Sequence, residues 1–202
     1  MYDGIPSITA LRTFQIHSWE SSPEYLLPDS HPWHPAFHPS PTYGATISRI
    51  KAQDGDKSRL EMASLMWISH AERPLKADEL CHALAVELGS TDFNIGSTPS
   101  MSTLVSCCQG LIAVDKEAST VRLIHFTLQE YLSAHPDLFS RPHSAMAEIC
   151  LTYLSSQQVE ALSANPAPDT RNTPFLEYCS VYWGVHVKRS SRTARYHLPW
   201  SY

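Results

Sequence analysis

The chain has 202 residues, a formal net charge of −5 and an ordinary share of apolar residues. Its length suits one domain or two small ones and is enough to bury a core. The mild negative charge argues against a general polyanion binder, because contacts with a phosphate backbone need clustered Lys and Arg.

Residues 1–41 are dominated by proline, as in "SSPEYLLPDSHPWHPAFHPSP". Proline removes a backbone donor and keeps the preceding residue out of the helical region, so we predict an irregular, disordered leader. Its histidines His31, His34 and His38 share no helix face, and no cysteine or carboxylate cluster completes a ligand set. We therefore predict no metal site here.

Helical patterns follow a linker or short helix predicted at residues 42–57. The stretch "SRLEMASLMWISHAE" carries a wide apolar face, which predicts a largely buried helix that ends at Pro74. The stretch "LKADELCHALAVELGS" predicts a second helix, with Asp78 and Glu79 near its start and Gly89 as its C-terminal stop.

A third helix is predicted in "TPSMSTLVSCCQG", with Thr98 as its N-cap and Gly110 closing it. Two β-branched runs around "KEAS" then predict a β-hairpin. In "VRLIHFTLQEYL" the second strand gives way to Thr127 and Glu130, which have the spacing of a capping box. The next helix should therefore begin at Thr127, with His125 just ahead of it.

Beyond residue 140 the chain predicts a smaller helical unit at residues 141–189. An amphipathic stripe in "SAMAEICLTYLSS" is followed by "TPFLEYCSVYWGVHVKR", which has Thr173 as a predicted N-cap and a basic end. Residues 190–202 have no periodicity and should form an irregular tail. The order of elements over residues 58–140 is that of a winged helix, so the predicted fold is mainly α with one small hairpin.

All of the cysteines lie in apolar, helix-like runs: Cys81, Cys107, Cys108, Cys150 and Cys179. Such positions favour buried, reduced thiols of a cytosolic protein. No stretch approaches the roughly 20 apolar residues of a membrane span, and the N-terminus lacks the pattern of a signal peptide. We expect a cytoplasmic protein without a membrane partner.

Three segments together resemble one family: "LMWISHAERPLKADELCHALAVE", "LVSCCQGLIAVDKEASTVRLIHFTLQEYL" and "PFLEYCSVYWGVHVKR". They resemble the region after the NACHT ATPase module of fungal NOD-like receptors, which are STAND signal-transduction ATPases that often carry ankyrin repeats. Its winged helix is of the type named after GPI inositol-deacylase. The resemblance covers about residues 42–189 and implies a non-catalytic regulatory module whose partner is a NACHT-type ATPase. We expect a piece without its ATPase, its ankyrin repeats or a cofactor, since the chain contains no G-x-x-x-x-G-K-[ST] loop.

The same resemblance assigns a role to His125. In NOD-like receptors a histidine in a motif like "IHFTLQEYL" contacts the β-phosphate of bound ADP, and this position is similar to His125. From the residues alone, two interpretations stay open. The ring adds a donor beside a helix N-terminus and forms half of an anion site, or it is half-buried in the corner and hydrogen-bonded to a neighbour. Without an ATPase module, we expect the ADP-sensing position to be inactive.

Catalysis and DNA binding are the alternatives. No G-x-S-x-G elbow occurs, and a thiol–base pair of the adjacent cysteines with His82 or His125 lacks an electropositive, exposed setting. We therefore expect no enzyme. A DNA-binding winged helix needs basic side chains on its third helix and wing. The third helix has none, and the wing offers only Lys116 and Arg122, so we expect no nucleic-acid partner.

The segment "SHAERP" places His70, Glu72 and Arg73 together. These residues either form a local ion pair that orients the turn before Pro74 or make a contact with another domain. The aromatic residues of "YCSVYWGVH" recur at helical spacing, which indicates a packing stripe more than a ligand cage.

Overall fold

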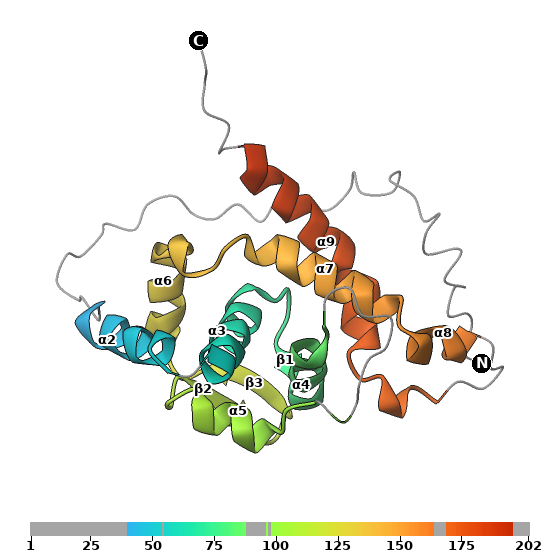
Figure 1. Ribbon diagram of the computed structural model, residues 1–202, viewed down its shortest axis with the longest axis horizontal. Helices are drawn as coiled ribbons and strands as arrows, with labels where there is room; N and C mark the ends of the chain where they lie inside the picture. The colour runs from blue at the N-terminus through green and yellow to red at the C-terminus, as the bar shows by residue number, and fades with distance from the viewer. Residues whose placement is uncertain (1–39, 54, 88–95, 97, 164–168, 196–202) are drawn as a thin grey trace, which may run out of the picture.

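The computed structural model describes residues 40–53, 55–87, 96, 98–163 and 169–195 (Figure 1). The predicted disordered leader therefore lies outside the described residues, except for its last two positions, which belong to a helix. The prediction of an irregular tail from residue 190 is wrong up to Arg195, because the last helix continues to that residue. No helix in these ranges is both long and apolar enough to span a bilayer.

The described helices follow one another as α2 (Ser40–Lys51), α3 (Gly55–His70), α4 (Ala77–Ala85), α5 (Met101–Cys107), α6 (Phe126–Ala134), α7 (Pro142–Leu154), α8 (Gln157–Ser163) and α9 (Leu176–Arg195). Two short 3₁₀ helices, η2 and η3, cover Pro136–Leu138 and Thr170–Asn172. The strands are β1 (Leu75–Lys76), β2 (Ile112–Asp115) and β3 (Thr120–Leu123). The fold is mainly α, with a winged helix followed by a helical unit, as the sequence predicted.

The predicted hairpin is confirmed, and it belongs to a three-stranded antiparallel sheet of order β1-β3-β2. Within the hairpin, Asp115 lies opposite Thr120, and the Asp115 carboxylate accepts the backbone N–H groups of Glu117 and Ala118, which closes the turn. The third strand, β1, pairs its Leu75 with Val121. Sequence patterns missed β1 because two residues are too few to show an alternation.

Three predicted helix starts are wrong. The N-cap of α5 is Ser100, whose hydroxyl accepts the Thr103 backbone N–H at 3.1 Å, two residues after the predicted cap. The last helix, α9, begins at Leu176, beyond a turn around the predicted cap Thr173. The third is the start of α6, which is described with the site below.

Two predicted helix ends also differ. The buried helix α3 stops at His70, four residues before the proline that was expected to end it. The next helix, α4, ends at Ala85, and the predicted stop at Gly89 lies outside the described residues.

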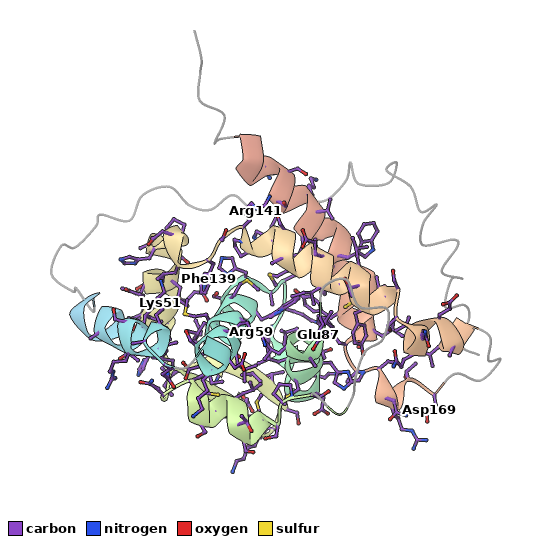
Figure 2. All side chains as sticks on the ribbon, viewed as in Figure 1. Lys51, Arg59, Glu87, Phe139, Arg141 and Asp169 are labelled. Atoms are coloured by element: carbon purple, nitrogen blue, oxygen red, sulfur yellow. The ribbon has the colours of Figure 1, made fainter. Side chains whose placement is uncertain are left out.

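The core is continuous from the winged helix into the helical unit, with α3 between the sheet on one side and the α7–α9 pair on the other (Figure 1). Trp67 of α3 is fully buried and meets Phe175 edge-on, with ring centroids 5.4 Å apart, and Tyr178 at 5.9 Å. Phe139, in the connection between α6 and α7, packs edge-on against His70 at 5.4 Å (Figure 2). The aromatic residues of α9 that face α3 are therefore core, as predicted.

Candidate functional site

The corner between β3 and α6 is built by two connecting residues, Ile124 and His125. The Ile124 backbone N–H donates to the Leu111 carbonyl at 2.9 Å, which continues the pairing of the hairpin beyond its last strand residue. His125 then has extended backbone angles and serves as the N-cap of α6, with its carbonyl accepting the Leu128 N–H at 3.1 Å. Its ring is exposed and makes no capping hydrogen bond. The half-buried interpretation of His125 is therefore wrong.

The capping box predicted at Thr127 and Glu130 does not form, because Thr127 already lies inside the helix. Its hydroxyl is instead 2.9 Å from the Tyr43 hydroxyl of α2, and the Tyr43 ring packs on Tyr131 with centroids 5.8 Å apart. This contact joins α2 to α6, and the N-cap of α6 lies two residues before the predicted one. The helix N-terminus, with its free backbone N–H groups, therefore begins directly at His125.

Two exposed apolar side chains flank the His125 ring. Phe126 is 73% exposed and Ile124 is 41% exposed, and Phe126 is the most exposed large apolar residue in the described part of the chain. We call Ile124, His125 and Phe126 the corner surface. Exposed apolar side chains are common singly, and here two lie on either side of one polar ring, which makes this corner the candidate site.

The surface that a DNA-binding winged helix would use is not basic. The short helix α5 contains no Lys or Arg, and its exposed positions are Ser102, Thr103, Val105 and Ser106. On the wing, the Asp115 carboxylate holds the turn that carries the basic Lys116. Lys116 and Arg122 are the basic residues of these elements, and with Asp115 and Glu117 beside Lys116 they form no cluster of phosphate contacts.

The thiols considered for a thiol–base pair are not activated. Cys108 is fully buried, and burial raises its pKa to about 12. Burial also raises the pKa of the Cys107 thiol, which donates to the Thr103 carbonyl. The His82 ring is engaged with the Tyr153 hydroxyl at 3.1 Å. A nucleophilic cysteine needs a lowered pKa, and both of these have the opposite shift.

The local ion pair expected in "SHAERP" forms with a different partner. Arg73 makes a bidentate pair with Glu79 of α4, at 2.7 and 2.8 Å, and Glu79 also accepts the Lys76 backbone N–H at 2.8 Å. Glu72 instead accepts from Arg189 of α9 at 2.8 Å. The segment thus connects α3 to both α4 and α9.

A second polar cluster, which the sequence patterns did not reveal, lies where α3, α7 and α9 meet. His143 and His186 face each other with their Nδ1 atoms 3.0 Å apart, and His186 Nε2 is 3.0 Å from the Tyr178 hydroxyl. Glu72 completes the cluster. These residues are far apart in sequence, so only the crossing of α7 and α9 brings them together.

The order of three helices, hairpin and following helix defines a winged-helix protein. A family model described as "GPI inositol-deacylase, winged helix domain" matches residues 50–151, from the last turns of α2 to α7. The match covers half of the chain, and the chain belongs to this family. Comparisons with curated proteins and with solved structures found no match. The predicted winged-helix type is thus confirmed.

Proposed function

We propose that the chain is a non-catalytic regulatory module of the NACHT receptor type, which docks a NACHT-type ATPase through the corner surface. The observation that carries this proposal is the 73% exposure of Phe126 beside the exposed His125 at the start of α6. A side chain of this size at the tip of a rigid corner has the features of an interface anchor. The resemblance of "IHFTLQEYL" to the ADP-contacting motif of NOD-like receptors supports the choice of partner.

The chemistry of the corner supports a shared anion site. The N-terminus of α6 presents backbone N–H groups and the positive end of the helix dipole, and the His125 ring can add one more donor. These groups form only half of a phosphate site, because a nucleotide diphosphate also needs the lysine and backbone loop of a P-loop. His125 would therefore contact the β-phosphate of ADP only when a NACHT module supplies that loop. The isolated chain should not bind ADP.

The test is a binding measurement between the purified chain and the NACHT module of a fungal NOD-like receptor from which its own winged helix has been removed. Phe126→Ser should weaken the complex about tenfold or more, since burying a Phe side chain is worth about 1.5–3 kcal/mol. Val181→Ser is the matched control, because Val181 is 59% exposed but lies on α9. Equal loss from both variants, or none from Phe126→Ser, would contradict the docking surface.

The alternative function, DNA binding, can be tested by retention on a heparin column. We expect the chain to pass through a heparin column at low salt, because α5 and the wing carry no basic cluster. A chain with Ser102→Lys and Ser106→Lys, which adds two charges on one exposed face of α5, should be retained more strongly and serves as the positive control. Retention of the unmodified chain beyond moderate salt would favour the nucleic-acid alternative.

A further inference from the structure

Three side chains of metal-ligand type meet at the junction of α3, α7 and α9, apart from the corner surface. Glu72 follows the end of α3, His143 lies in the first turn of α7, and His186 lies in the middle of α9. One ligand atom from each lies within 4.8 Å of the other two. His186 is fully buried, and the Glu72 side chain is 13% exposed. The core therefore surrounds His186 and most of the Glu72 side chain, while His143 is half-buried.

The distance between the Nδ1 atoms of His143 and His186 is close to the distance between two histidine nitrogens that bind the same ion. These Nδ1 atoms are 3.0 Å apart, and the ring planes differ by 26°. Two nitrogens at the usual zinc distance and tetrahedral angle lie about 3.3 Å apart. An ion would replace the present hydrogen bond, and each ring would turn so that its lone pair points at the ion.

One of the two oxygens of the Glu72 carboxylate is available to bind an ion. Its Oε2 accepts from Arg189 at 2.8 Å, while its buried Oε1 has no hydrogen-bond partner among the described residues. A buried carboxylate oxygen without a partner is unfavourable. A cation at this position would satisfy the unpaired oxygen.

The outer contacts of His186 suit a metal-binding tautomer. Its Nε2 is 3.0 Å from the Tyr178 hydroxyl, which also accepts the Glu72 backbone N–H at 3.1 Å. With Nε2–H donating to Tyr178, the Nδ1 lone pair is left for an ion, and such second contacts commonly orient ligand histidines.

We propose that Glu72, His143 and His186 form a binding site for one divalent zinc ion, with water as the fourth ligand. Two imidazoles, one carboxylate and one open position are a common donor set for zinc. The ion would join the end of α3 to α7 and α9, and thus fasten the helical unit to the winged helix.

Substitution of Arg189 distinguishes a zinc site from a purely structural ion pair. Its guanidinium pairs with Glu72 but is half exposed, so it can move into solvent when an ion binds. Its positive charge opposes a second cation nearby. Arg189→Gln should therefore tighten zinc binding, whereas Glu72→Gln should weaken it. A purely structural ion pair would make the two variants behave alike.

Zinc titration of the full-length chain by calorimetry at pH 7 tests the site. Because His31, His34 and His38 offer competing ligands, a chain with all three changed to Gln is the background for every variant. We expect one zinc per chain with micromolar affinity or better, and a higher unfolding temperature with zinc present. The cobalt-loaded chain should show the visible absorption of a tetrahedral ion.

Three variants of that background chain decide the outcome. Because His143 is half-buried, the His143→Gln variant should fold, as circular dichroism can verify. It should bind zinc at least tenfold more weakly than the background chain. Arg189→Gln should bind more tightly, and His125→Gln, at an exposed histidine, should bind as the background does. No stoichiometric binding by the background chain, full binding by His143→Gln, or weaker binding by Arg189→Gln would overturn the proposal.

Discussion

Trp67→Ala should lower the free energy of unfolding by about 3–5 kcal/mol, the range for removing a large aromatic side chain from a core. Trp67 is fully buried and packs edge-on against Phe175 and Tyr178, which belong to the segment leading into α9 and to α9 itself. Its removal therefore leaves a cavity where the winged helix meets the helical unit. Urea unfolding followed by circular dichroism measures the loss.

Trp67→Phe should restore most of this stability, because the indole Nε1 has no hydrogen-bond partner within the described ranges and its loss leaves no polar group unpaired. Trp183→Ala is the control, since Trp183 is only half-buried at the edge of the core. A loss below about 1 kcal/mol for Trp67→Ala, or two separate unfolding transitions in the unmodified chain, would contradict a continuous core.

Arg73→Ala should destabilise the protein by about 3 kcal/mol, because it leaves the Glu79 carboxylate buried without its counter-charge. Glu79 is 1% exposed and receives two hydrogen bonds from the Arg73 guanidinium, which also lies over the Tyr178 ring at 5.3 Å. The loss should stay at the lower end of the range for buried pairs, since Arg73 is itself a quarter exposed.

A double-mutant cycle separates the charge from the packing. Glu79→Gln in the Arg73→Ala background should recover part of the stability, because a neutral amide has no charge to leave unpaired. The Lys76 backbone N–H would still find an acceptor in that amide. Additive losses from the two substitutions would show that the pair makes no net contribution.

The fold class could be predicted because periodic apolar patterns show both the helices and the hairpin. The starts of the helices could not, because several nearby residues can serve as the cap, as Ser100 does in place of Thr98, and because a polar side chain can take a distant partner instead. The hydroxyl of Thr127 was expected to cap its own helix but bonds to Tyr43, 84 positions earlier. At the start of α4 only half of a capping box forms: the Glu79 carboxylate accepts the Lys76 backbone N–H, while the ammonium group of Lys76, at the N-cap, has no acceptor to offer the helix.

The corner surface and the zinc site also differ in how far the sequence could reveal them. His125 stands in a motif, so the sequence alone singled it out, although its exposure followed only from the backbone at the corner. His143 and His186 are 43 residues apart and lie in helices whose other residues read as ordinary amphipathic patterns. Their meeting depends on the crossing of α7 and α9, which no local pattern specifies.

The release rate of ADP from a NACHT module tests the regulatory role most directly. With saturating chain added in trans, we predict that ADP leaves the module about tenfold more slowly, the effect of one contact worth about 1.4 kcal/mol, and that His125→Ala abolishes the slowing while Val181→Ser does not. An unchanged release rate in a verified complex, or slowing that survives His125→Ala, would contradict the account.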